Sequence, residues 1–216
     1  MEDIVIRHYQ LTDRGAVRRI AYDTAFFGNS AEVFFDSREL LEDLLTSYYL
    51  DHEPESCFVA ESQGRVIGYL IGSKDYLALG KRAQGKVLPR LLGKSILQGA
   101  LLKRKNFIFI IKLMRSFFRG ELSSPDFSRE YPAVLHINLA DGFRNLGIGS
   151  RLMDAFFGYL ARQKVKGVHL ATFSENARRF YQRQGFTLLH TAKRTYFAYL
   201  LAKEVFCYTY GKKITA

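Results

Sequence analysis

The sequence is poor in cysteine, and its two cysteines lie far apart. Cys57 and Cys207 form neither a CxxC pair nor a set that could stabilise a small domain through disulfides. This excludes a disulfide framework and a cysteine-based zinc site of the usual spacing. Four of the histidines also lack an HExxH or other metal spacing, so we expect no metal: His8, His52, His169 and His190.

Long apolar runs are missing too. No stretch approaches the roughly 18 uninterrupted apolar residues that are typical of a membrane-spanning helix. The N-terminal sequence MEDIVIRHYQ has an acid at position 2 and lacks the apolar segment of a secretory signal. Together with the scarcity of cysteine, these absences predict a cytoplasmic protein.

The chain does contain ample apolar material and an uneven charge distribution. Its 216 residues are 48% apolar and 14% aromatic, which is enough for the core of a single domain spanning residues 1–216. Twelve Lys and Arg but only one acid, Asp75, lie between Lys74 and Arg119, so this segment carries the whole net charge of +11. We predict that residues 74–131 form a basic, largely helical insertion within the domain.

The second half of this segment has the periodicity of a cationic amphipathic helix. Lys112, Arg115 and Arg119 share one helical face with Ser116, and large apolar residues surround the rest. Four interpretations remain open: a lid that packs on the core, a helix on an anionic membrane surface, nonspecific contact with nucleic acid, or attraction of an anionic substrate. Because no nucleic-acid motif accompanies the charge, we do not expect a nucleic-acid partner.

Residues 135–186 hold the most specific pattern. Alternation from Leu135 to Leu139 predicts a strand, and a glycine turn follows at Arg144-Asn145-Leu146-Gly147-Ile148-Gly149. Apolar residues at helical spacing come next: Ile148, Leu152, Met153, Phe156, Phe157 and Leu160.

A glycine turn that opens a helix leaves N–H groups without intrahelical partners at the positive end of the helix dipole, which favours the binding of phosphate. We expect the missing Cβ atoms of Gly147 and Gly149 to let a pyrophosphate approach the backbone. No Lys-Ser or Lys-Thr pair follows, so the turn is not a P-loop.

A strand at 168–172 and a short helix ending in Phe180-Tyr181-Gln182-Arg183-Gln184-Gly185-Phe186 complete the pattern. Together with Arg144-x-x-Gly147-x-Gly149, it resembles the acetyl-CoA-binding core of the GCN5-related N-acetyltransferase (GNAT) superfamily. The resemblance implies an α/β (α+β) fold: a mixed central sheet of about six to seven strands, with a splayed central pair and flanking helices. The flanks agree with this order of elements. We expect a strand at 4–7, helices around 13–21 and 34–50, a hairpin at 58–71 and a last strand within 195–210.

Acetyl transfer to an amine needs an acid for the leaving thiolate and a base for the amine proton. Tyr181 matches the motif tyrosine that, by resemblance, points at the coenzyme A sulfur, and a phenol with a pKa of about 10 is protonated at neutral pH. His136 is the candidate base because its intrinsic pKa is suitable and it lies on the motif strand. Asp141, Glu61 and a chain of water molecules are alternatives.

The resemblance also implies which residues hold the cofactor. Ile137 and Leu139 match the strand positions whose free N–H groups bind the acetyl carbonyl and pantetheine. Either Ser174 or Asn176 would contact the cofactor at the start of the last helix. The main chain of the glycine turn would bind the pyrophosphate, with Arg144 adding charge, through Arg144, Asn145, Leu146, Gly147, Ile148, Gly149 and Ser150.

The implied function is transfer of an acetyl group from acetyl-CoA to a primary amine of a small molecule or peptide. Direct attack is expected because no Cys or Ser nucleophile beside a base is evident. The alternative is a non-catalytic coenzyme A-binding sensor or docking module, associated with a membrane surface or with a second copy of the chain. The phrases Tyr131-Pro132-Ala133-x-Leu135-His136-Ile137 and Val165-x-Gly167-Val168-His169-Leu170 are similar to a bacterial subgroup resembling the acetyltransferase-like domain of O-GlcNAc hydrolases.

Overall fold

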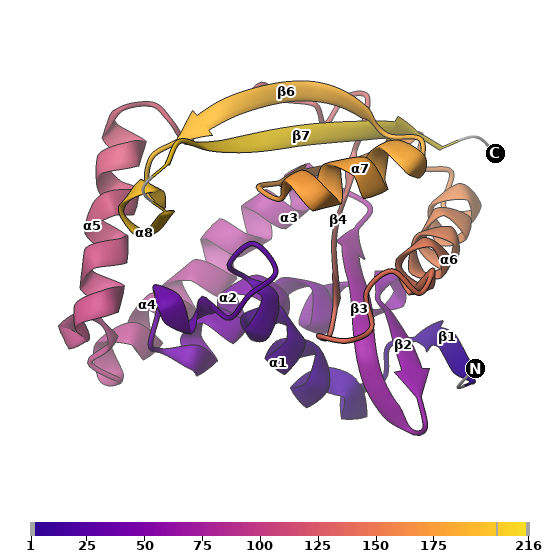
Figure 1. Cartoon of the computed structure of the whole chain (residues 1–216), viewed down its shortest axis with the longest axis horizontal. Coiled ribbons are helices and arrows are strands. Elements are labelled where there is room, and N and C mark those ends of the chain that lie inside the picture. The colour runs from indigo at the N-terminus through magenta and orange to yellow at the C-terminus, as the bar shows by residue number, and fades with distance from the viewer. Residues whose placement is uncertain (1–2, 202, 215–216) are drawn as a thin grey trace.

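A mixed seven-stranded sheet runs through the molecule (Figure 1). In the computed structural model, which describes residues 3–201 and 203–214, the strand order is β1-β2-β3-β4-β5-β7-β6. Neighbouring strands pair antiparallel except β4 and β5, which are parallel. This confirms the predicted mixed sheet. The strands are β1 (Ile4–His8), β2 (Phe58–Ser62), β3 (Arg65–Ser73), β4 (Ala133–Leu139), β5 (Gly167–Thr172), β6 (Thr187–Arg194) and β7 (Val205–Lys213).

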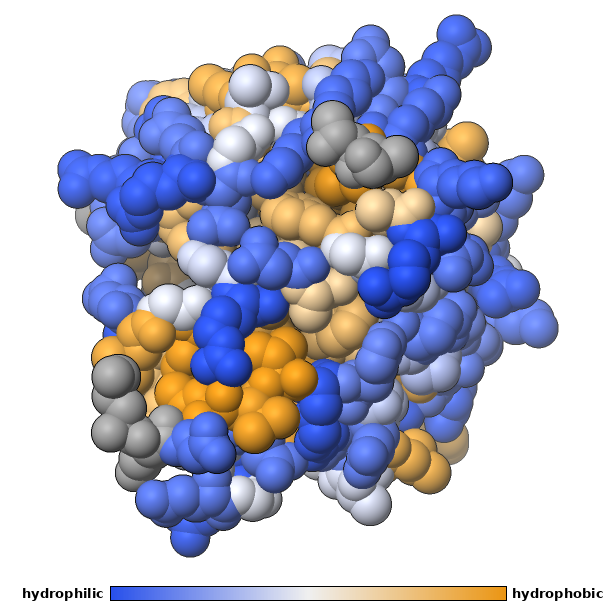
Figure 2. Space-filling model, turned by 90° about the vertical axis from the view of Figure 1, so that its right-hand side faces the viewer, coloured by the Kyte–Doolittle hydropathy of each residue, from blue (hydrophilic) through white to orange (hydrophobic). Residues whose placement is uncertain are grey.

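Helices cover both faces of the sheet. On one face, α1 (Arg14–Thr24) and α2 (Arg38–His52) pack over a core that includes Tyr69 of β3. On the other face, α6 (Ile148–Arg162) and α7 (Glu175–Arg183) enclose a second core. Seen from the side of α6 and the chain ends, long hydrophilic side chains project around a middle in which apolar residues are visible (Figure 2). Three short 3-10 helices complete this part: η1 (Leu11–Asp13), η2 (Ala31–Val33) and η3 (Pro54–Ser56).

The predicted hairpin is present as β2 and β3. Its two-residue turn uses Gln63 and Gly64, with φ of 49° and 73°. A two-residue turn with positive φ at both positions twists in the same sense as the strands that it joins. The turn therefore fixes the register of β3, the strand next to the site.

The prediction for the C-terminal region is partly wrong. Residues 195–210 do not form one strand, because a short helix, α8 (Ala198–Leu201), precedes β7, and β7 continues to Lys213. A further strand, β6, was not predicted. β6 is an edge strand in which only Arg194 is buried, so its sequence shows no alternation between apolar and polar residues.

The basic segment between β3 and β4 is helical. Its aromatic residue Phe109 packs against Phe34 and Phe197, at centroid distances of 4.7 and 5.7 Å, and so attaches the segment to the rest of the molecule. That it is an insertion within a single domain stays a prediction. No helix in the described ranges is long and apolar enough to cross a membrane. The segment comprises α3 (Tyr76–Arg82), η4 (Ala83–Val87), α4 (Leu88–Leu97), η5 (Ala100–Leu102) and α5 (Arg104–Phe118).

A buried amide fastens the start of α5 to the first helical layer. Asn106 is fully buried, and its Oδ1 accepts a hydrogen bond from the Asp36 N–H at 2.7 Å. Its Nδ2 donates to Ser37 Oγ at 2.8 Å and to the Ala100 carbonyl oxygen at 2.9 Å. One side chain therefore satisfies polar groups from two segments that lie far apart in the sequence.

Replacing Asn106 with alanine should lower the free energy of unfolding by about 3 kcal/mol, because several buried polar groups lose their partners. Denaturation in urea, followed by circular dichroism, would measure the change. Arg104→Ala, at an exposed position in the same helix, is the control and should change stability by no more than about 0.5 kcal/mol. Equal effects of the two substitutions would contradict the anchoring role of the amide.

Candidate active site

β4 and β5 diverge along most of their length. They pair only at Ala133–Val168 and Val134–His169, although β4 continues to Leu139 and β5 to Thr172. On its other side β4 stays paired with β3 up to Leu139. The predicted splayed pair is therefore confirmed, and among residues 3–201 and 203–214 no strand lies along this edge of β4 beyond Val134.

Alternate residues of β4 direct their N–H groups into this gap. The Ala140 N–H donates to the Ile67 carbonyl oxygen at 2.8 Å, so the N–H groups of even-numbered residues point toward β3. By alternation, those of Ile137 and Leu139 point into the gap. These are the two residues that the superfamily resemblance assigned to the acyl group and pantetheine. The geometry leaves their donors free for that purpose, and the role itself stays a prediction.

The glycine turn joins β4 to α6 at the wide end of the gap. Gly147, at the N-cap of α6, has φ of 75° and Asn145 has φ of 65°, both in the left-handed region. Within the described chain, no acceptor receives a hydrogen bond from the main-chain N–H groups of residues 145–150. These donors lie at the positive end of the 15-residue α6. The turn thus has the free donors that an anion-binding site requires, and its contact with a pyrophosphate stays a prediction.

The two glycines of the turn differ in their roles. A Cβ at Gly147 would meet no atom within 4 Å, so this position needs glycine for its backbone conformation. A Cβ at Gly149 would lie 3.1 Å from the Phe180 ring of α7. The expectation that the missing Cβ of Gly149 clears a path for a ligand is therefore wrong. It lets the start of α6 pack against α7, and only the Gly149 N–H is left as a contact for a ligand.

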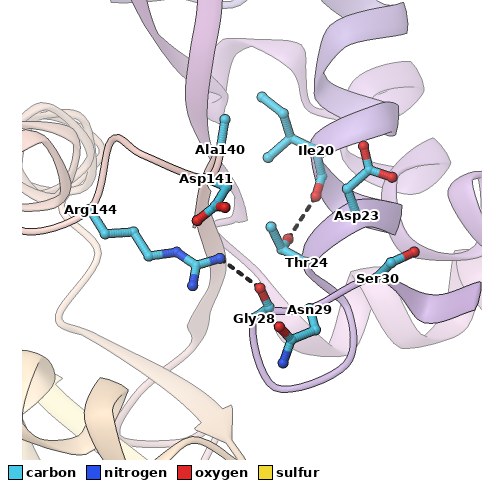
Figure 3. Close-up of a pocket in the computed structure, with 9 residues that line it drawn as sticks. All are labelled: Ile20, Asp23, Thr24, Gly28, Asn29, Ser30, Ala140, Asp141 and Arg144. Carbon is cyan, nitrogen blue, oxygen red and sulfur yellow. Dashed lines mark hydrogen bonds between the residues drawn. The ribbon is translucent and has the colours of Figure 1, made fainter. Parts of the chain in front are cut away.

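Arg144 faces a cavity of about 340 Å³ beside the turn (Figure 3). Its guanidinium donates a hydrogen bond at 2.6 Å to the carbonyl oxygen of Gly28, in the loop after α1. Asp23 and Asp141 also line this cavity, so the guanidinium shares it with two carboxylates. The side chain connects the turn to the α1 layer, and its contact with a pyrophosphate stays a prediction.

Tyr181 lies in the core, and its hydroxyl has no hydrogen bond among the described residues. The hydroxyl is not among the fully enclosed oxygens that lack a partner, so it is not completely sealed from the surface. Burial raises the pKa of Tyr181 well above its usual value, so the group stays protonated throughout the physiological range. The same shift makes the phenol a weaker acid than an exposed tyrosine, and its role as proton donor stays a prediction.

A second tyrosine, absent from the sequence-based candidates, lies close to Tyr181. Tyr69 of β3 is opposite Asn138 of β4 in the sheet register, and Asn138 Nδ2 donates to the Tyr69 hydroxyl at 2.7 Å. Burial raises the pKa of Tyr69, and the neighbouring Tyr181 raises it further. The two phenols are neighbours although they belong to different cores. The sequence held no signal for this, since the pairing of Tyr69 with Asn138 depends on strand register.

His136 lies on the same face of β4 as Asn138, facing α2. Its ring is 5.5 Å from that of Tyr49, edge to face. Although solvent reaches the imidazole, surrounding protein atoms desolvate it and lower its pKa below the usual value. With its pKa below the usual value, the imidazole is neutral at pH 7, and its role as a base stays a prediction.

The alternative bases are placed less favourably. Glu61 accepts hydrogen bonds from the Arg7 guanidinium at 2.9 and 2.5 Å, which commits its carboxylate to an ion pair on the outer strands. Asp141 is exposed and lines the cavity beside Arg144. Neither contacts Tyr181 or Tyr69 in any described interaction. His136 likewise forms no described interaction with either tyrosine, so the identity of the base stays a prediction.

The two candidates at the start of α7 have different environments. Ser174 is the N-cap, and its hydroxyl accepts a hydrogen bond from the Ala177 N–H at 3.3 Å. Asn176 is exposed in the first turn, without a described partner. Ser150, at the start of α6, instead accepts a hydrogen bond from Gln184 Nε2 at 2.8 Å. Of the two, Asn176 has the free side chain, and its contact with a cofactor stays a prediction.

The described residues contain no cluster of His, Cys, Asp and Glu that could hold a metal. Cys57 and Cys207 are both buried and free. His169 donates its Nδ1–H to the Tyr131 carbonyl oxygen at 2.6 Å, which is a structural role.

Comparison with known proteins agrees with this geometry. Residues 121–188 match the family model described as Acetyltransferase (GNAT) domain. The crystal structure of SsHAT aligns with 99% of this chain and 100% of its own, at 25% identity and a TM-score of 0.72. Ard1 from Thermoplasma volcanium aligns over 99% of both chains, at 22% identity and a TM-score of 0.56. yncA from Salmonella typhimurium, solved with acetyl-CoA, aligns with 99% of this chain and 95% of its own, at 13% identity and a TM-score of 0.57. At those identities the last two show the fold alone, and the seven-stranded sheet with its flanking helices matches the GNAT fold.

Replacing Gly147 with valine should weaken the binding of coenzyme A at least roughly tenfold, because a β-branched residue resists positive φ and would turn the free N–H groups away from a common point. Isothermal titration calorimetry would measure the affinity. Gly120→Val is the matched control, since Gly120 also has positive φ and open space around its Cβ position but lies outside the turn. An equal loss of affinity in both variants would show only a general loss of stability.

Proposed function

We propose that this chain, which has the GNAT fold and matches the acetyltransferase (GNAT) domain over residues 121–188, transfers the acetyl group of acetyl-CoA to a primary amine. The observation that carries the proposal is the gap between β4 and β5, with free N–H groups along β4 and more free N–H groups at the turn that follows it. In this proposal the hydroxyl of Tyr181 faces the same gap. Such a gap suits a long ligand with phosphate at one end and a thioester near the other.

The chain's own groups fit acetyl-CoA, which the GNAT fold binds as a cosubstrate. The main chain of residues 145–150 would hold the pyrophosphate through its unbonded donors. The N–H groups of Ile137 and Leu139 would bind pantetheine and the thioester oxygen, and they would stabilise the charge that develops on that oxygen. These contacts use the backbone, so the side chains at those positions are free to serve the core.

In the proposed reaction, the amine nitrogen attacks the thioester carbon, and the bond from that carbon to sulfur breaks. The sulfur leaves as a thiolate and takes the proton of the Tyr181 hydroxyl. Because burial raises the pKa of Tyr181, its proton is present at neutral pH, and the hydroxyl would stabilise the leaving thiolate by donating a hydrogen bond to it.

The proton lost by the amine goes to His136 in this proposal. Desolvation lowers the pKa of His136, so its imidazole is neutral and able to accept at pH 7. Asp141 and a water chain to bulk solvent remain the other routes for this proton.

The second candidate is a module that binds coenzyme A without catalysis. The match of Tyr181 to the motif tyrosine and the intact glycine turn favour the enzyme. The finer similarity to the acetyltransferase-like domain of O-GlcNAc hydrolases involves residues 131–137 and 165–170 and specifies no acceptor. The proposal therefore names an amine as acceptor and no particular compound.

Tyr181→Phe should lower kcat by roughly 10²-fold or more while leaving the affinity for coenzyme A nearly unchanged, because the substitution removes the donor and keeps the ring. The release of free thiol from acetyl-CoA, measured with a panel of amines, would follow the reaction. Tyr199→Phe, on α8, is the control and should retain full activity. Coenzyme A binding by the parent protein without turnover of any amine would support the non-catalytic module instead.

The rate should also fall in acid, with a midpoint below about pH 6.5, the value for an ordinary histidine. The sign follows from the lowered pKa of His136: its neutral form persists to lower pH than usual, and protonation below that point removes the base. His136→Gln should reduce kcat and abolish this acid limb. If the limb survives in His136→Gln at saturating substrates, another group takes the proton.

A further inference from the structure

Helix α5 is apolar on two sides. Its inner side packs on the protein through Phe109 and the fully buried Asn106 and Ser116. Its outer side carries four large apolar residues at helical spacing that are about half exposed or more. These are Phe107 at 55%, Ile111 at 50%, Met114 at 48% and Phe118 at 78%. At 100° per residue the two sets lie on roughly opposite sides of the helix.

The outer stripe of α5 is part of a larger concentration of exposed apolar residues. In Figure 1, α5 stands at the edge of the molecule, and its far side faces away from the sheet. α4 shows the same arrangement, with buried Leu91 and Ser95 on its inner side. Most of the large apolar residues that are exposed in the described chain fall in this segment. On α4, η5 and the adjoining turn they are Leu88, Leu92, Ile96, Leu97, Leu101 and Leu102.

Unpaired positive charge borders the stripe. Among the basic residues of 74–119, Lys94, Lys105 and Arg119 form ion pairs with described acids. Arg104 and Arg115 lie at one edge of the apolar stripe of α5 and form none. The result is a helix surface with bulky apolar residues in the middle and free cations at its border.

We propose that the outer faces of α4 and α5 bind the surface of an anionic lipid bilayer, with α5 lying in the plane of the interface. Apolar side chains would enter the boundary between headgroups and acyl chains while the cations contact lipid phosphates. The proposal concerns a surface remote from the gap between β4 and β5 and does not depend on acetyl transfer.

The charges favour lipid over the other occupants of such a face. In a closed dimer the same patch meets itself, so two copies would bring their unpaired arginines together without acidic partners. Nucleic acid would use the cations but gives no role to Phe107, Ile111 and Phe118, because its binding is dominated by phosphate contacts. Of these three occupants, an anionic bilayer is the one that uses both the apolar centre and the basic border.

Flotation with liposomes tests the proposal on the whole chain. Vesicles of phosphatidylcholine with 30% phosphatidylglycerol, a composition chosen for the assay, should carry the protein upward, and pure phosphatidylcholine should do so much less. The triple variant Phe107→Ser, Ile111→Ser, Phe118→Ser should bind the anionic vesicles at least roughly tenfold more weakly. Arg104→Gln with Arg115→Gln should weaken binding and reduce its dependence on salt.

Matched variants keep the test specific. A control triple variant removes three exposed apolar residues elsewhere and should leave flotation unchanged. It combines Val5→Ser, Leu11→Ser and Leu188→Ser, at positions that are 47%, 76% and 47% exposed. The double variant Arg19→Gln, Arg65→Gln removes two exposed positive charges elsewhere and should also leave flotation unchanged. Circular dichroism confirms that each variant is folded. Flotation unchanged by the α5 triple variant overturns the proposal. The proposal is also overturned if the parent protein does not bind anionic vesicles. This holds equally if the parent forms a dimer that the triple variant loses, or if it binds duplex DNA instead.

Discussion

The separation of β4 from β5 is the constraint on which the rest of the site depends. A sheet edge inside a molecule would normally be satisfied by the next strand, and an unpaired buried N–H carries a free-energy cost of about 1–3 kcal/mol. Here pairing stops after Val134 and His169, and no other strand takes its place. The structure tolerates the open edge because β3 holds β4 firmly on its other side, from Val134 to Leu139. The donors left free are therefore held at fixed positions, which is what binding a ligand by backbone requires.

The same separation explains how side chains from two cores meet. Tyr69 belongs to the core beneath α1 and α2, whereas Tyr181 belongs to the core beneath α6. In a continuous sheet the strands would keep these phenols apart. With the strands parted, Tyr181 reaches the neighbourhood of Tyr69, whose hydroxyl is already engaged by Asn138 at 2.7 Å. The Tyr69 oxygen accepts this hydrogen bond and keeps its own proton. The assignment of proton donation to Tyr181 therefore depends on its match to the motif tyrosine and stays a proposal.

The sequence predicted those features that depend on local rules. The glycine turn, the start of α6 at Ile148 and the hairpin turn at Gln63 and Gly64 follow from backbone conformations that few residues other than glycine adopt readily. Features that depend on distant contacts were missed. β6 is mostly exposed, so its sequence does not alternate between apolar and polar residues. The pairing of Tyr69 with Asn138 depends on strand register, which the sequence alone does not give. The role of Gly149 was misjudged for the same reason, since only the fold shows Phe180 against it.

The outer stripe of α5 is not explained by the need to fold. The inner side already supplies the anchors of a stable helix: Phe109 in an aromatic cluster and Asn106 with three buried hydrogen bonds. Polar residues on the outer side would leave those contacts intact and would improve solubility. Apolar residues there increase the exposed hydrocarbon surface at a free-energy cost of about 25 cal/mol per Å². The sequence nevertheless has a line of apolar residues bordered by unpaired arginines: Phe107, Ile111, Met114 and Phe118. Binding to a membrane surface would remove these residues from water and would explain why they are apolar.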